Sequence, residues 1–158
     1  MVSAPLSAAG PKADTKAKLR LWIRLLRASR FIEAKVRARL KAEFNCTLPR
    51  FDVMAALYRQ PEGMLMSEIS RFLMVSNGNV TGIVDRLVAD GLAMRSQRDG
   101  DRRTSFIRLT SRGHALFESM ARAHQKWVDE LLADVSADDA NELSAKLKAF
   151  RSNWEGEA

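Results

Sequence analysis

The chain has 158 residues, 46% of them hydrophobic, and a mean hydropathy of −0.23. These values are typical of one globular domain, alone or with a dimerisation extension. They exclude a membrane-spanning chain, because no apolar run approaches the roughly 18 residues that a span needs. The net charge of +7 and the pI near 10.1 indicate a polyanionic partner.

Charge is unevenly distributed along the chain. Residues 15–45 contain ten basic and two acidic side chains, and residues 91–112 contain six basic and two acidic ones. Residues 118–142 have the opposite balance, with seven acidic and two basic side chains. Two basic regions and one acidic region on a small chain predict separate surfaces with separate roles.

Residues 1–14 are rich in Ala, Pro, Ser and Gly and lack the charged-then-apolar layout of a signal peptide. They predict a disordered leader. Cys46 is the single cysteine, which excludes an internal disulfide and fits the reducing cytoplasm, where we expect the protein to act. A redox-sensing role for Cys46 stays open beside that of an inert thiol.

Residues 15–44 predict one long helix with two different faces. Apolar side chains from Trp22 to Phe44 recur on one side, and basic side chains occupy the other. Four basic residues that step by four, four and three positions are called the basic stripe: Lys16, Arg20, Arg24 and Arg27. Guanidinium groups at this spacing suit phosphate oxygens. A solvated helix face and an added attraction for DNA are the alternatives.

Three shorter helices follow. The first spans about 47–59 and has a proline in its first turn, where proline is tolerated. The second spans 67–73, with Ser67 as its expected cap, and the third spans 76–91, with Ser76 as its expected cap. The link between the second and third helices is too short for anything but a tight helix-turn-helix corner.

The helix 76–91 combines a regular apolar face with an unusual polar edge. Its apolar residues recur at helical spacing, and Gly91 is placed to end it in a left-handed conformation. The opposite edge carries Asn77-Gly78-Asn79 and Thr81-Gly82, which are poor helix formers. Their small bulk suits an edge that approaches another polar surface closely.

A β-hairpin is predicted next, with strands 92–97 and 104–109 on either side of an Asp-Gly turn. The hairpin carries five arginines within a stretch of 14 residues: Arg95, Arg98, Arg102, Arg103 and Arg108. Arginine beside a tight turn can enter a narrow minor groove of DNA. A solvated surface hairpin is the alternative.

Two further helices, about 110–135 with Thr110 as cap and 136–154, complete a mainly α fold with a small β-hairpin wing. This order predicts a winged helix-turn-helix domain with an all-helical dimerisation region from both termini. The flanking helices have more apolar surface than a winged helix can bury. Burial against a second copy of the chain in a two-fold dimer is the simplest explanation. We divide the chain into a leader (1–14), a dimerisation and effector helix (15–45), a DNA-binding lobe (46–112) and C-terminal dimerisation helices (113–154).

A winged helix presents its second helix to the major groove of DNA and its hairpin to the neighbouring backbone or minor groove. The amides of Asn77 and Asn79 can pair with adenine edges, and Thr81 can touch a thymine methyl or a phosphate. Arg86 lies one turn further on, where a phosphate contact would position the helix without specifying a sequence.

The segment DRLVADGLAMRSQRDGDRRTSFIRLTSRG resembles the signature of the MarR family of bacterial regulators. The matching positions are Asp85, Arg86, Leu87, Gly91, Leu92, Arg95, Asp101, Arg103, Leu109, Thr110 and Gly113. The resemblance covers about residues 15–154 and implies a two-fold dimer on a palindromic operator of double-stranded DNA. It also implies that Asp101 holds the wing arginine Arg103. The expected DNA-binding residues are Ser76, Asn77, Asn79, Thr81, Arg86, Arg95, Arg98, Asp101, Arg102 and Arg103.

The resemblance further implies a repressor that a small ligand releases from DNA. The chain is similar to the subgroup that governs degradation of hydroxycinnamates and related aromatic acids, several of which respond to an aryl-CoA thioester such as p-coumaroyl-CoA. The phosphates of the CoA group would lie on the basic stripe. A free phenolic acid is the alternative effector. The expected effector residues are Arg20, Trp22, Arg24, Arg27, Phe31, Phe51, Met54, Tyr58, Met66 and His114. The alternative for the Met and aromatic residues of this set is that they belong to the hydrophobic core and bind no ligand.

Catalysis is not expected from this sequence. His114 and His124 are ten residues apart on one predicted helix, with no carboxylate or cysteine at metal-ligand spacing, and no phosphate loop or G-x-S-x-G motif occurs. No metal or other cofactor is therefore expected. A constitutive architectural DNA-binding protein, with the same basic wing but no ligand pocket, is the alternative from another class.

Overall fold

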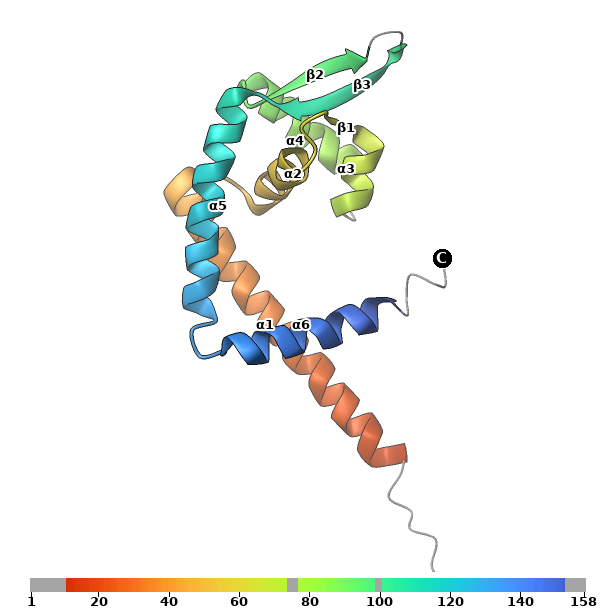
Figure 1. Ribbon diagram of the computed structural model, residues 1–158, viewed down its shortest axis with the longest axis vertical. Coiled ribbons are helices and arrows are strands. Elements are labelled where there is room, and N and C mark those ends of the chain that lie inside the picture. Colours follow the sequence, from red (N-terminus) through yellow and green to blue (C-terminus); the bar gives the residue numbers. More distant parts are fainter. Residues whose placement is uncertain (1–10, 74–76, 99–100, 153–158) are drawn as a thin grey trace, which may run out of the picture.

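The computed structural model describes residues 11–73, 77–98 and 101–152, with the side chains of all but 11–13, 77–78, 98, 101–104 and 151–152. The elements are α1 (Pro11–Phe44), α2 (Leu48–Tyr58), β1 (Met64–Leu65), α3 (Met66–Leu73), α4 (Asn77–Ala89), β2 (Ala93–Arg98), β3 (Asp101–Leu109), α5 (Ser111–Leu131) and α6 (Ala137–Ser152). The predicted mainly helical fold with a small hairpin is confirmed (Figure 1). Within the described ranges, no helix is both long and apolar enough to cross a bilayer.

The three strands form one antiparallel sheet in the order β1-β3-β2. In the hairpin, Ala93 pairs with Leu109, as the predicted strands require. Strand β1 was not predicted, because two residues are too few to show the alternation that marks a strand. Its Met64 pairs with Ile107 of β3, so the segment before α3 is tied to the wing.

Helix α1 begins at Pro11, before the predicted start at residue 15, so residues 11–14 of the predicted leader are helical. Proline suits a first helical turn, and the negative charge of Asp14 is favoured near a helix N-terminus. The Asp14 carboxylate also pairs with Lys18 Nζ at 2.7 Å, one turn further on.

The hydrophobic core joins the C-terminal half of α1, through α5, to the lobe formed by α2, α3, α4 and the sheet. Leu40, Leu57, Leu87, Ile107 and Met120, each from a different element, are fully buried in it. Burial of one such side chain contributes about 1.5–3 kcal/mol. By contrast, Figure 1 shows the N-terminal half of α1 extending away from the lobe.

The joint between α4, β2 and α5 depends on one threonine and two glycines. Gly91 has φ of +70°, which confirms the predicted left-handed end of the helix. Thr110 is confirmed as the cap of α5: its hydroxyl accepts the Gly113 N–H at 3.0 Å and donates to the Gly91 carbonyl at 2.7 Å. A Cβ at Gly113 would lie 2.0 Å from the Leu92 carbonyl oxygen, so only glycine fits there.

Several element boundaries differ from the prediction. Strand β3 begins at Asp101 rather than Thr104, because antiparallel pairing continues towards the turn. Helix α3 begins at Met66, so Ser67 lies inside it; the Glu68 carboxylate instead accepts the Leu65 N–H at 2.7 Å. Helix α5 ends at Leu131 and not near residue 135.

Candidate nucleic-acid interface

The outward edge of α4 is polar and the opposite face is apolar. Asn79, Thr81, Gly82 and Arg86 are exposed. The residues that anchor the helix from its other side are fully buried: Val80, Val84 and Leu87. The residues predicted to meet DNA therefore share the accessible edge of the helix, as far as the structure describes them. Ser76 and the side chain of Asn77 lie outside the described residues.

An ion pair that the sequence did not predict joins α4 to the wing. Arg95 Nη2, on β2, donates to Asp85 Oδ1, on α4, at 2.7 Å. Both side chains are substantially exposed, so the pair contributes less than about 1 kcal/mol to stability. Its consequence is geometric, because it directs Arg95, one of the predicted DNA-binding residues, towards α4.

The C-terminal end of α4 is held from two other helices. Arg50 Nη2, on α2, donates to Asp90 Oδ2 at 2.6 Å, and Arg112 Nη1, on α5, donates to the Asp90 carbonyl oxygen at 3.3 Å. Together with the pair between Asp85 and Arg95, these contacts link α4 and the residue that follows it to α2, α5 and β2.

The wing is formed by β2 and β3. Arg98 pairs in register with Asp101, after an irregularity between Gln97 and Arg98. Arg108 is exposed on β3. The side chains of four predicted contact residues lie outside the described residues: Arg98, Asp101, Arg102 and Arg103. The predicted hold of Asp101 on Arg103 stays a prediction.

Part of the predicted effector set forms an aromatic cluster between α2 and α5. The rings of Tyr58 and His114 lie 5.3 Å apart, and Phe117 joins them, 4.8 Å from Tyr58 and 5.4 Å from Phe51. Phe51 is buried, as is the neighbouring Met54. The Tyr58 hydroxyl donates to Glu118 at 3.1 Å, and this hydrogen bond raises the pKa of Tyr58.

The rest of the predicted effector set lies elsewhere within a single chain. Arg20, Trp22, Arg24 and Arg27 are exposed on the half of α1 that extends away from the lobe (Figure 1). Phe31 is exposed as well, with Lys35 Nζ 5.6 Å from its ring centre. Met66 is half-buried at the start of α3. One protomer does not bring the four residues on the extending half of α1 to the aromatic cluster.

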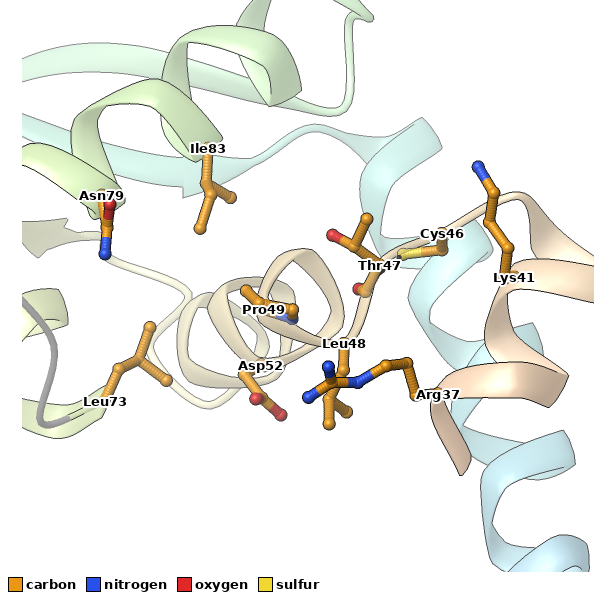
Figure 2. A pocket seen from close by; sticks show the side chains of 10 residues that line it. All are labelled: Arg37, Lys41, Cys46, Thr47, Leu48, Pro49, Asp52, Leu73, Asn79 and Ile83. Atoms are coloured by element: carbon orange, nitrogen blue, oxygen red, sulfur yellow. Dashed lines mark hydrogen bonds between the residues drawn. The ribbon is translucent and has the colours of Figure 1, made fainter. Parts of the chain in front are cut away.

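A cavity of about 720 Å³ lies between α1, α2, α3 and α4 (Figure 2). It is lined by Arg37, Lys41, Cys46, Thr47, Leu48, Pro49, Asp52, Leu73, Asn79 and Ile83. None of the predicted effector residues is among them. The sequence held one signal for this site, the basic pair Arg37 and Lys41 one turn apart on α1. It held no signal that these residues would meet α4.

Burial shifts three titratable groups near this cavity. It raises the pKa of the Asp52 carboxyl, against the attraction of His124. It lowers the pKa of His124, whose ring lies 5.1 Å from that of Phe51. Burial also raises the pKa of the Cys46 thiol, and this favours an inert cysteine over a reactive one.

Comparisons with known proteins agree on one family. A model of the MarR family matches residues 46–105. The transcriptional activatory protein BadR of Rhodopseudomonas palustris is 30% identical over 132 residues, which cover 80% of this chain and 75% of BadR. The HTH-type transcriptional regulator MhqR of Bacillus subtilis is 28% identical over 135 residues, covering 85% of this chain and 91% of MhqR. The solved structure of a MarR family transcriptional regulator from Silicibacter pomeroyi is similar with a TM-score of 0.75 and 32% identity, over 91% of this chain and 99% of that one.

Proposed function

Because this chain belongs to the MarR family of DNA-binding transcriptional regulators, we propose that it acts as a two-fold homodimer on a palindromic operator, under the control of a small aromatic effector. The named relatives are transcriptional regulators, and the chain is a regulator rather than an enzyme, as its sequence predicted.

The exposed polar edge of α4 is the observation that carries the operator proposal. Asn79, Thr81 and Arg86 are accessible there, while the other side of the helix is anchored in the core. Side chains of these types can reach base edges and phosphates in a major groove. Two such edges related by a two-fold axis would meet half-sites about 10 bp apart, so the operator is expected to be palindromic.

Exposed apolar side chains at both ends of the chain support the homodimer. Trp22 of α1 is 58% exposed, and Leu143 and Phe150 of α6 are each 55% exposed. No residue of α6 whose side chain the structure describes is buried. An exposed apolar surface of this extent is typical of a protein–protein interface. In a two-fold dimer the same surface of a second copy would cover it.

The proposed effector is p-coumaroyl-CoA or a related hydroxycinnamoyl-CoA, and its binding would release the regulator from genes of aromatic-acid catabolism. The basic stripe supports this form of effector, because Arg20, Arg24 and Arg27 are exposed and suit phosphate oxygens. A free phenolic acid is the second candidate. BadR is named as an activator, so activation instead of repression is an outcome that reporter assays must resolve.

Footprinting on the promoter region of the chain's own gene tests the operator proposal. We expect one protected palindrome, with half-sites about one helical turn apart. Diffuse coating of the fragment would favour the architectural DNA-binding protein and overturn the regulator. The salt dependence of binding does not separate the two, because both bind phosphates.

Calorimetric titration with p-coumaroyl-CoA and with p-coumarate tests the effector proposal. We expect the thioester to bind more tightly than the free acid, and Arg24→Gln to weaken thioester binding while leaving p-coumarate binding unchanged. Equal affinity for both compounds, or no binding of either, contradicts a thioester effector.

A further inference from the structure

Three cations from three helices line a second, smaller cavity beside α4. Lys41 comes from the last turn of α1, Arg50 from the first turn of α2, and Arg86 from the last turn of α4. These three residues are called the cationic cluster. The cavity has a volume of about 190 Å³. Its other lining residues are uncharged: Asn45, Thr47 and Ile83.

A left-handed residue at the end of α1 brings the three helices together. Asn45 has φ of +48°, and its N–H donates to the Lys41 carbonyl at 3.1 Å. Asparagine tolerates this conformation better than most residues with a Cβ. The chain therefore turns within three residues, so that α2 starts close to Lys41. Figure 2 shows Thr47, the N-cap of α2, between Lys41 of α1 and Ile83 of α4.

The positive charge of the cationic cluster is balanced only in part. Arg50 Nη2 donates to Asp90 Oδ2 at 2.6 Å. Lys41 Nζ donates to the neutral Asn45 Oδ1 at 2.6 Å. Among the described side chains, neither Lys41 nor Arg86 forms an ion pair. An anion between these cations would therefore be stabilised by charges that the described part of the chain leaves unbalanced.

The size of the cavity and the types of its donors fit one phosphate group. Its volume of about 190 Å³ is below the roughly 300 Å³ at which small-molecule pockets begin, so it suits a single charged group and not a whole organic ligand. A lysine binds phosphate as a point charge, and an arginine binds it through paired N–H donors. An arginine has five N–H donors, so the contact of Arg50 Nη2 with Asp90 leaves others for a phosphate.

The cationic cluster and the wing lie on opposite flanks of α4. At about 100° per residue, Asp85 lies about 60° to one side of Gly82. Arg86 and Ile83 lie about 40° and about 100° to the other side. Arg95 of the wing contacts Asp85, whereas the small cavity is lined by Arg86 and Ile83. A helix in the major groove has one DNA backbone on each side, so the wing and the cluster would face different backbones.

We propose that the cationic cluster binds one backbone phosphate of the operator, on the flank of α4 opposite the wing. The inference rests on the proposed operator binding and adds Lys41 and Arg50 to the predicted DNA-binding residues. A phosphate contact carries no base information, so the cluster sets the position of α4 in the groove without changing the preferred sequence.

Lys41→Met tests the proposal on the full-length chain, because Lys41 is exposed. Operator affinity, measured by fluorescence anisotropy, should fall by about tenfold through loss of a charge-assisted contact. The slope of log affinity against log salt concentration should become shallower by about 0.9 for each protomer bound. Lys41→Arg keeps the charge and should retain the affinity and the slope. Lys148→Met removes the same charge from the exposed face of α6 and should leave the slope unchanged.

Operators with single neutral phosphates locate the contact. Each phosphate is replaced in turn by methylphosphonate. At one position in each half-site the replacement should weaken binding of wild type and of Lys148→Met, but not of Lys41→Met. This position should lie across the major groove from the phosphate that is coupled in the same way to Arg102→Met in the wing. A general loss of folding in Lys41→Met would not reproduce a coupling to one phosphate.

Three results would overturn the proposal. The first is the same salt slope in Lys41→Met and Lys148→Met, and the second is the same pattern of methylphosphonate effects in wild type and Lys41→Met. The third is binding of inorganic phosphate by the free protein that Lys41→Met removes, without coupling to any operator phosphate. That result would assign the cationic cluster to a free phosphate compound.

The results also separate this inference from the proposed function. A protected palindrome with an unchanged salt slope in Lys41→Met retains the operator function and overturns the phosphate site. Diffuse coating of the promoter fragment with a shallower slope in Lys41→Met supports the phosphate site and overturns the proposed regulator.

Discussion

Gly82 lies on the exposed edge of α4, where the described structure gives no internal reason for a glycine. A Cβ added there would meet no atom within 4 Å, and the backbone is ordinary helix. Glycine inside a helix costs about 0.5–1 kcal/mol relative to alanine. The use of glycine at this position is explained if a DNA surface approaches the helix closely.

Substitution Gly82→Ala should therefore separate stability from DNA binding. We expect the free energy of unfolding to rise by about 0.5–1 kcal/mol, since alanine favours the helix and meets no clash. Operator affinity should fall, because the new methyl group keeps α4 further from the bases. Urea denaturation and fluorescence anisotropy measure the two effects, and a gain in stability excludes misfolding as the cause. Unchanged affinity would mean that this edge does not approach DNA closely.

His124 should make stability depend on pH. Burial lowers its pKa below the ordinary value of 6.5, and the attraction of Asp52 opposes this shift only in part. Its stabilising contribution is present above pH 6.5 and is lost as the pH falls below 6.5 and through the lowered pKa of the folded chain, because the unfolded chain binds the proton more readily in this range. The pKa of Asp52 is raised above its ordinary 3.8, so this carboxyl changes the free energy of unfolding in the acid range, near and above pH 3.8.

The free energy of unfolding should therefore decrease between about pH 7.5 and pH 5.5, the range in which histidine titrates. His124→Gln, which cannot titrate, should reduce this decrease when denaturation is followed at both pH values. Identical pH dependence in wild type and His124→Gln would show that other groups govern it.

At the scale of the elements, Thr110 connects the end of α4 to the start of α5. Its hydroxyl makes two hydrogen bonds, to the Gly113 N–H and to the Gly91 carbonyl. Thr110→Ala should lower the free energy of unfolding by about 0.5–2 kcal/mol, the range for loss of a helix cap. Thr110→Ser keeps the hydroxyl and should retain most of the stability. Thermal denaturation of the two variants measures the difference, and equal losses would exclude the hydroxyl as the cause.

At the scale of the whole molecule, α6 buries none of the side chains that the structure describes for it. Leu147 is 48% exposed on this helix, between Leu143 and Phe150. Leu147→Glu should convert the proposed dimer to a monomer, because a charge in an apolar interface loses its hydration. Sedimentation equilibrium measures the mass, and operator affinity should fall with it. Lys148→Glu, a larger change in charge at the neighbouring position, should leave the dimer intact. A monomeric wild type would contradict the prediction.

Local chemistry in the sequence determined the helices, the hairpin and several of their ends. Gly91 ends α4 because glycine tolerates a positive φ, and Thr110 caps α5 because its hydroxyl can accept an unpaired backbone N–H. Ser136 was expected to start the last helix, and its hydroxyl accepts the Asp139 N–H at 3.1 Å. These features were predictable because each depends on residues a few positions apart.

Only the tertiary structure decided which residues meet across elements. It paired β1 with β3, joined Asp85 to Arg95, and brought Arg37 and Asn79 to one cavity. Such contacts depend on how whole helices pack, and no local pattern encodes them. Helical periodicity predicts that an apolar stripe will be buried, but it does not show whether another element of the same chain or a second chain buries it. For this reason Trp22, expected on the same covered stripe as Leu40, is exposed in the single chain while Leu40 is buried.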